Sequence, residues 1–318
     1  MLGAARRGGS ISLTEVRADR PRFSYTQHNR LAMQWNTTRF AIDLSRPKVM
    51  GIVNVTPDSF SDGGAHESTQ AALQHCEKLL RDGADILDIG GESSRPGATP
   101  LPLEQELARV LPVLREAVKL GVPISVDSYK PQVMLAALDL GVDIINDIWA
   151  LRWRGADAGA TAPDASKLVA AHGRCGVCLM HMHREPRSMQ VEPMTGDVVV
   201  QVHAFLQGRA QALQTCGVAK ERIVLDPGIG FGKTVAQNFS LLARQRELLS
   251  GGYALMAGWS RKSSLAALGG ESAPLAAHQR MVPSVAAALL AAERGAAVLR
   301  VHDVLETVQA LRLLAALE

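Results

Sequence analysis

The sequence alternates short apolar runs with longer amphipathic segments, and the alternation is regular from about residue 47 onward. Each apolar run ends in polar residues, and seven of the runs follow a glycine. Glycine readily takes the left-handed conformation found just after a helix, so the segments before these glycines are predicted to be helices. The glycines are Gly83, Gly121, Gly141, Gly176, Gly217, Gly252 and Gly295.

The segments between the apolar runs carry apolar residues at helical spacing. In the first of them, Ala72, Cys76 and Leu79 fall on one face of a helix. Pro112 lies inside the second segment and is predicted to kink or locally break that helix. The predicted helices cover residues 69–80, 103–120, 131–140, 164–171, 197–215, 236–249, 283–294 and 304–317.

Counting the apolar run that begins at Met50, the chain contains eight successive strand–helix units. Such units predict parallel strands with right-handed crossovers, and eight of them favour one α/β domain, a closed (β/α)₈ barrel of the TIM type, over residues 46–318. An open doubly wound sheet is the structural alternative, but no GxGxxG motif follows the first strand. Residues 1–45 are poorly patterned and are predicted to form a leader that is partly disordered or lies over the surface of the domain.

Composition narrows the class of protein without identifying it. The net charge of +3 over 318 residues gives no case for nucleic-acid binding, and no apolar run is long enough to predict a membrane span. The first residues lack the apolar core of a signal peptide, and four cysteines in so long a chain indicate a reducing compartment. The cytoplasm is therefore the expected location.

Two of the cysteines, Cys175 and Cys178, have the CxxC spacing of zinc and redox sites. They lie in an apolar run that is predicted to be a strand, where residues three apart face opposite sides. The two sulfurs should therefore diverge, and both cysteines are predicted to be buried structural residues.

Polar side chains end every predicted strand. In a barrel these ends converge on one face, which is the face that carries the active site. A single residue of this kind could equally be a helix cap or a satisfied hydrogen-bonding group, but the pattern repeats on all eight strands. The residues are Asn54, Asp88, Glu92, Asp127, Asn146, Asp147, His181, His183, Asp226, Arg261, Lys262, Arg300 and His302.

The charges of these residues predict a cavity with two sides. The cations Lys262, Arg300 and His302, with Arg95, suit an anionic group such as phosphate. Asn54 alone provides too few ligands for a metal site built entirely by the protein. It suits Mg²⁺, which can take its other ligands from water and substrate phosphates. The acceptors suit a neutral heterocycle rich in N–H donors; they are Asp127, Asn146 and Asp226.

Two motifs resemble known sites and are set aside. The run from Asp226 ends in Gly-Lys-Thr like a phosphate-binding loop, but Pro227 stands where the first glycine is required. His181 and His183 could ligate a metal, as in barrel hydrolases, but those ligands come from the first strand and these residues end the fifth. A hydrogen-bonded wall of the pocket is the preferred interpretation. No nucleophile with an adjacent base is readable, so covalent catalysis is not predicted.

Eight motifs, in order, give the chain a resemblance to the dihydropteroate synthase family, folate-pathway enzymes inhibited by sulfonamides. They are MGIVNVTPDSFSDGG, DIGGESSRPGA, SVDSYKP, IINDI, LMHM, DPGIGFGK, WSRKS and RVHDV. The resemblance covers about residues 46–318. It implies a (β/α)₈ barrel, usually a homodimer, that requires Mg²⁺. It also implies a reaction joining p-aminobenzoate to 6-hydroxymethyl-7,8-dihydropterin diphosphate, with release of pyrophosphate and 7,8-dihydropteroate.

The resemblance also implies roles for residues that match the family motifs. The pterin would be bound by Asp127, Asn146, Asp226 and Lys262, and the diphosphate by Asn54, Arg300 and His302, with Asn54 also on the Mg²⁺. The p-aminobenzoate would be bound by Ser94, Arg95, Pro96, Phe231, Lys262 and Ser263. Asp62, with Phe60, would belong to a flap over residues 56–64 that closes on the substrates. The implied catalytic set is Asp127, Asp226, Lys262, Arg300, His302 and Asp62.

Residue chemistry then predicts a dissociative displacement, because p-aminobenzoate is already neutral at pH 7 and needs no strong base. Pyrophosphate would leave first, helped by the cations, and the carboxylates would favour the positive charge that develops on the pterin. Two alternatives remain open: a pterin-dependent methyltransferase domain, and a non-catalytic paralogue that only binds pterin.

Overall fold

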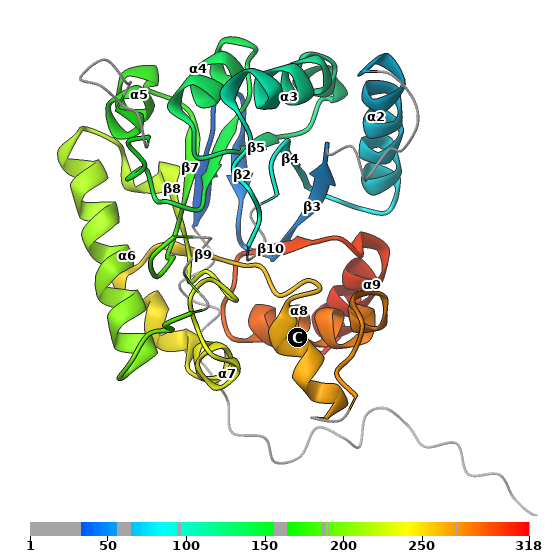
Figure 1. Ribbon diagram of the computed structural model, residues 1–318, viewed down its shortest axis with the longest axis vertical. Helices are drawn as coiled ribbons and strands as arrows, with labels where there is room; N and C mark the ends of the chain where they lie inside the picture. The colour runs from blue at the N-terminus through cyan, green and yellow to red at the C-terminus, as the bar shows by residue number, and fades with distance from the viewer. Residues whose placement is uncertain are drawn as a thin grey trace, which may run out of the picture.

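The structure is a computed structural model that describes residues 33–55, 65–93, 97–155, 164–185, 189, 191–270 and 273–317. Eight parallel strands close into a barrel in the order β10-β3-β4-β5-β6-β7-β8-β9 (Figure 1). The predicted fold is therefore confirmed. The strands are β3 (Lys48–Asn54), β4 (Ile86–Gly90), β5 (Ile124–Asp127), β6 (Ile144–Asp147), β7 (Gly176–Met180), β8 (Ile223–Asp226), β9 (Ala254–Ala257) and β10 (Val298–Val301).

Helices surround the barrel, as the periodicity predicts (Figure 1). They are α2 (Ala65–Arg81), α3 (Leu103–Ala117), α4 (Pro131–Asp139), α5 (Ala165–His172), α6 (Val198–Thr215), α7 (Val235–Ala243), α8 (Met281–Glu293) and α9 (Val304–Ala315). Short 3₁₀ helices extend or join them: η3 (Val118–Leu120), η4 (Lys220–Arg222), η5 (Gln245–Gly251), η6 (Ser263–Gly269) and η7 (Ala277–Arg280). None of the described helices is long and apolar enough to cross a membrane.

Two local predictions differ from the structure. Helix α3 runs through Pro112 without a break, because Val110, Val113 and Leu114 pack into the core on both sides of the proline. Six of the seven glycines have the predicted positive φ, but Gly176 does not; it lies inside β7, and Gly173 ends the preceding helix with φ 80°.

Residues 33–45, the last part of the predicted leader, form a hairpin that packs on the barrel. Strands β1 (Gln34–Asn36) and β2 (Ala41–Asp43) pair antiparallel and cover the amino-terminal end of the barrel. Trp35 is fully buried there, and its indole Nε1 donates to the carbonyl of Arg222 at 3.0 Å. A Cβ on Gly176 would lie 2.9 Å from that Nε1, which explains a glycine inside a strand. The apolar periodicity of so short a hairpin is too weak to be recognised in sequence.

The CxxC prediction is confirmed. Cys175 packs in the layer between strands and helices, whereas Cys178 packs inside the barrel with Trp35 and Met50. Both are buried, so the two thiols lie on opposite sides of β7.

Candidate active site

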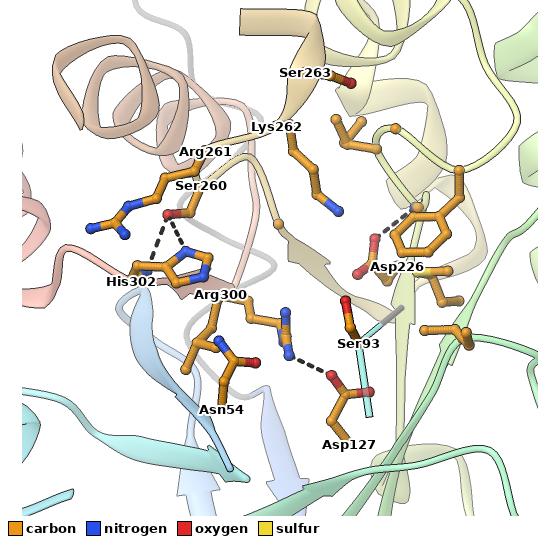
Figure 2. Close-up of a pocket in the computed structure, with 18 of the residues that line it drawn as sticks. Asn54, Ser93, Asp127, Asp226, Ser260, Arg261, Lys262, Ser263, Arg300 and His302 are labelled. Atoms are coloured by element: carbon orange, nitrogen blue, oxygen red, sulfur yellow. Dashed lines mark hydrogen bonds and ion pairs between the residues drawn. The ribbon is translucent and has the colours of Figure 1, made fainter. Parts of the chain in front are cut away.

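A cavity of about 340 Å³ lies at the carboxyl-terminal end of the barrel strands (Figure 2). This volume is within the usual range for small-molecule sites, about 300–1,000 Å³. Most of the described residues that were predicted to bind substrate or metal line it together: Asn54, Asp127, Asp226, Phe231, Lys262, Ser263, Arg300 and His302. Arg300 and His302 are two apart on the β10 segment and reach the same cavity, as the strand period predicts.

The predicted pterin residue Asn146 is placed differently. It is 4 % exposed and is absent from the lining of the cavity. Its amide Nδ2 donates to the buried carboxylate of Asp88 at 3.1 Å. Asn146 therefore supports the floor in this structure, although β5 and β6 place it directly beside Asp127.

Five other predicted residues lie outside the described part of the chain. They are Phe60 and Asp62 of the first loop and Ser94, Arg95 and Pro96 of the second. The predicted flap over residues 56–64 lies there too. The neighbouring Glu92 and Ser93 are described, and both line the cavity.

Arg300 joins two carboxylates at the floor of the cavity. Its Nε donates to Asp88 Oδ2 and its Nη2 donates to Asp127 Oδ2, each at 2.6 Å. Asp88 is completely buried, and its second oxygen, Oδ1, has no partner among the described residues. The guanidinium is thus held in one orientation from below, at the edge of the cavity that also carries Asn54 and His302 (Figure 2).

Burial raises the pKa of two carboxyls that line the cavity, Asp127 and Asp226. Loss of hydration raises the pKa of Asp127 to about 7, against the opposing effect of Arg300. Burial also raises the pKa of Asp226, and the backbone N–H of Gly228, which donates to its Oδ1 at 2.7 Å, opposes the rise. In such a poorly hydrated place, a hydrogen bond donated by a ligand stabilises a carboxylate more than the same bond would in water.

The opposite wall combines a cation with an aromatic ring. The ammonium of Lys262 lies 4.3 Å from the centre of the Phe231 ring, and Ser263 follows it at the rim. The loop that carries Phe231 is held from below by Lys233, whose Nζ donates to the carbonyls of Gly228 and Phe231 at 2.8 and 3.1 Å. Lys233 is buried and does not line the cavity, so the motif that resembles a phosphate loop serves the backbone of its own loop.

A buried ion network anchors the turn after β4. Lys130 pairs with Glu92 and with Glu106, and the Tyr129 hydroxyl donates to Glu92 Oε1 at 2.7 Å. Burial raises the pKa of Glu106, and Lys130 opposes that rise. This network holds Glu92, at the cavity wall, to β5 and α3.

The sequence did not single out several residues that line the cavity. Arg280 comes from η7, inside a connection with no strand-end pattern, and its Nη1 donates to the carbonyl of Arg261 at 3.2 Å. Ile148, Met180 and Ile229 supply apolar walls. The sequence places Met180 at the end of a predicted strand, but an apolar side chain there cannot be distinguished from a residue of the hydrophobic core.

Metal ligands are sparse in the described part of the chain, where no group of three or more His, Cys, Asp or Glu side chains could hold an ion. Asn54 offers one amide oxygen, half-buried, beside Arg300 and His302. One neutral oxygen next to an anion site fits Mg²⁺ that arrives with a diphosphate and keeps its waters, and it fits no metal that needs a full protein cage. His181 and His183 do not converge with a third ligand among the described residues.

The comparisons with known proteins agree on one family. A family model described as pterin binding enzyme matches residues 50–302. The dihydropteroate synthase of Neisseria meningitidis serogroup C is 49% identical over 281 residues, which are 87% of this chain and 95% of that protein.

Solved structures give the same result. The dihydropteroate synthase of Xanthomonas albilineans with 4-aminobenzoic acid has a TM-score of 0.78 and 47% identity, covering 87% of this chain and 95% of that one. The Burkholderia cenocepacia enzyme complexed with 7,8-dihydropteroate has a TM-score of 0.78 and 46% identity, covering 90% of this chain and 96% of that one.

Proposed function

Because the chain belongs to the dihydropteroate synthase family of pterin-binding enzymes, we propose which groups of its cavity carry the family's reaction. The reaction joins 6-hydroxymethyl-7,8-dihydropterin diphosphate to p-aminobenzoate and releases pyrophosphate and 7,8-dihydropteroate. One observation carries the assignment: a single cavity holds two carboxylates, Asp127 and Asp226, together with the anion-binding side chains of Arg300 and His302, and the Arg300–Asp127 contact lies where the two sets meet.

The pterin is assigned to the carboxylate side. A pterin ring presents several N–H groups, and buried carboxylate oxygens are the acceptors that such groups require. Asp226 is held by the Gly228 N–H and Asp127 by Arg300, so both acceptors are oriented before the ring arrives. Asn146 would join this set only if its amide left Asp88.

The diphosphate is assigned to Arg300, His302 and Asn54. Arg300 is a permanent cation, and its anchors on Asp88 and Asp127 use Nε and Nη2. Asn54 would hold Mg²⁺ through its amide oxygen, and the bound ion would neutralise charge on the departing pyrophosphate. Arg300 and His302 would stabilise the same charge by direct hydrogen bonds.

The p-aminobenzoate is assigned to the wall formed by Lys262, Phe231 and Ser263. The Phe231 ring and the Lys262 ammonium suit a ligand with an aromatic ring and a carboxylate. The carboxylate of p-aminobenzoate would lie near the solvent-exposed rim, at Ser263. Ser94, Arg95 and Pro96 are kept in this set on the family motif alone. Sulfonamides, which share the arylamine group, are expected to compete at the same wall.

The charges favour a dissociative displacement. The bond between the pterin methylene carbon and the diphosphate oxygen breaks first, and its electron pair leaves with the pyrophosphate toward Arg300 and His302. The cation left on the pterin is stabilised by Asp127 and Asp226 until the neutral amine attacks and then loses its proton to water. No side chain needs to act as a strong base.

Two rival functions make different demands on the cavity. A pterin-dependent methyltransferase has no need of the Arg300 and His302 pair, which this cavity retains. A non-catalytic paralogue would bind pterin and form no product. The comparisons support neither.

A homodimer is proposed through helices α8 and α9, which pack together. Large apolar side chains are exposed on both helices: Met281, Val282, Leu290, Leu305 and Leu313. Exposed apolar groups gathered on neighbouring helices are typical of subunit interfaces. The four cysteines are free thiols, which supports the cytoplasm as the proposed compartment.

The test combines product formation with positional isotope exchange. The protein is incubated with Mg²⁺ and pterin diphosphate labelled with ¹⁸O at the oxygen bonded to carbon, with and without p-aminobenzoate. The complete mixture should form 7,8-dihydropteroate and pyrophosphate in equal amounts. Without p-aminobenzoate, the label should move into non-bridging positions, because reversible departure lets the phosphate rotate. Product without such exchange, and without any pterin cation trapped by added nucleophile, would contradict the dissociative order.

A further inference from the structure

Ser260 connects the ends of two neighbouring strands at the anion side of the cavity. Strands β9 and β10 pair in parallel as far as Ala257, and the chain then turns away through Ser260 to Arg261, which has φ 57°. Because β9 has turned away, the backbone N–H of His302 finds no carbonyl there and donates to Ser260 Oγ at 3.1 Å. The same Oγ lies 2.9 Å from Nδ1 of the His302 ring (Figure 2).

The hydrogen bonds that Ser260 can make determine which nitrogen of the His302 imidazole carries the proton. Ser260 Oγ already accepts the backbone N–H and has one proton of its own. Ser260 lines the cavity but is only 7% exposed, and its hydroxyl has no other partner among the described residues. If Nδ1 carried a proton, the hydroxyl proton would have no acceptor among the described residues, which is unfavourable at so enclosed a position. The hydroxyl therefore donates to Nδ1.

The carboxylate next to His302 does not change this result. Asp303 is engaged by Arg261, whose Nη2 and Nε donate to its two oxygens at 2.7 and 3.3 Å. A carboxylate at Nδ1 could only accept a proton and would place the hydrogen there. A hydroxyl can donate, so Ser260 permits the tautomer that a carboxylate would forbid.

We propose that Ser260 is a positioning residue that holds His302 in the tautomer with its proton on Nε2. In that tautomer the cavity-lining imidazole presents an N–H donor where a bare lone pair would repel an anion. In Figure 2 Ser260 lies on one side of the His302 ring, and Asn54 and Arg300 lie on the other. The inference rests on the proposed function for the identity of the anion, the diphosphate of the pterin substrate.

The proposal separates Ser260 from Ser263, three residues later. Both serines line the cavity, but Ser263 is exposed at the rim and is assigned to p-aminobenzoate, whereas Ser260 is 7% exposed and bonds to His302. A change at Ser260 should therefore alter the capture of pyrophosphate and pterin diphosphate and leave the KM for p-aminobenzoate unchanged.

The experiment uses Ser260→Ala, with Ser260→Thr as the variant that retains the hydroxyl. Ser250→Ala is the matched control. Ser250 Oγ also contacts a histidine distant in sequence, His203, whose Nε2 lies 2.9 Å away, but this pair is on the surface. Nitrogen-15 NMR of the histidine rings reads the tautomer in the substrate-free protein. Calorimetry with inorganic pyrophosphate and Mg²⁺ reads the anion site, and steady-state kinetics reads both substrates.

The wild type and Ser260→Thr should show His302 with a protonated Nε2 and an unprotonated Nδ1. Ser260→Ala should mix the tautomers, weaken pyrophosphate binding and raise the KM for the pterin diphosphate about five- to tenfold, as expected for one lost hydrogen bond. Ser250→Ala should match the wild type.

Two outcomes would overturn the proposal: a wild-type spectrum with the proton on Nδ1, or a Ser260→Ala variant whose His302 signals and pyrophosphate affinity are unchanged. The NMR readout needs no turnover. If the wild type forms no dihydropteroate yet shows the predicted tautomer, the proposed function fails and the role of Ser260 stands.

Discussion

Each end of the barrel pairs an arginine with a fully buried aspartate, but the two pairs have different roles. At the amino-terminal end, Arg39 reaches from the hairpin to Asp143, whose two oxygens accept hydrogen bonds from Arg39 and from the backbone N–H of Ile124. At the cavity end, Arg300 is shared between Asp88 and Asp127, and Asp88 Oδ1 has no partner among the described residues.

The difference separates stability from function. Asp143 has all of its hydrogen-bonding capacity used within the fold, so its pair can only hold the hairpin to the barrel. At the cavity end, burial raises the pKa of Asp127 against the opposing effect of Arg300, and both side chains line the cavity, where a ligand can reach them. The same residue types thus close one end of the barrel and prepare the other for chemistry.

The largest effect is expected at the cavity end. Replacing Arg300 with alanine removes the cation from the departing diphosphate, so kcat/KM for the pterin diphosphate should fall by about 10²–10³-fold. Steady-state kinetics measures the loss, and a raised KM for the pterin diphosphate should account for much of it. Unchanged kinetics would refute the assignment of Arg300 and would remove the functional half of the comparison.

A smaller effect is expected at the other end, where Arg39→Ala serves as the matched variant. It removes a partly exposed cation from the buried Asp143, which keeps its hydrogen bonds from the backbone N–H groups of Arg39 and Ile124, so the free energy of unfolding should fall by about 2 kcal/mol. Denaturant titration measures this change. The activity per folded molecule should stay at the wild-type value, because Arg39 lies at the opposite end of the barrel from the cavity. A selective loss of activity would show that the two ends are coupled.

The smallest effect concerns His181, another buried group of the cavity end whose Nδ1 has no partner among the described residues. Burial lowers its pKa to about 2, so the folded protein holds the ring neutral. In the unfolded chain the ring gains a proton below the ordinary histidine pKa of about 6.5. The folded state is therefore most stable relative to the unfolded state above this pH and loses stability as the pH falls below it.

Between pH 7.5 and 5.5, the wild type should therefore lose about 1.4 kcal/mol more stability than a His181→Gln variant, which has no proton to gain there. Chemical unfolding at the two pH values measures the difference. His278→Gln, at an exposed position on η7, is the control and should follow the wild type. Parallel curves for wild type and His181→Gln would disprove the assignment.

Most of the fold could be predicted, because the spacing of apolar residues along each short segment indicates whether that segment is a strand or a helix. The strand period places Arg300 and His302 on one side of β10 and separates Cys175 from Cys178 across β7, and both predictions hold. The hairpin at Trp35 could not be predicted, since its two short strands are held by contacts with Arg222, nearly 190 residues away.

The candidate site divides in the same way. The sequence by itself determined the barrel, the face that carries the cavity and most of the polar groups on it, because the carboxyl ends of parallel strands must meet. Only the tertiary structure decided what each group contacts there. It shows the amide of Asn146 bonded to Asp88, Arg280 at the cavity from a connection without a pattern, and Ser260 in contact with His302. These contacts join residues from different strands and loops, and their direction depends on how those elements pack.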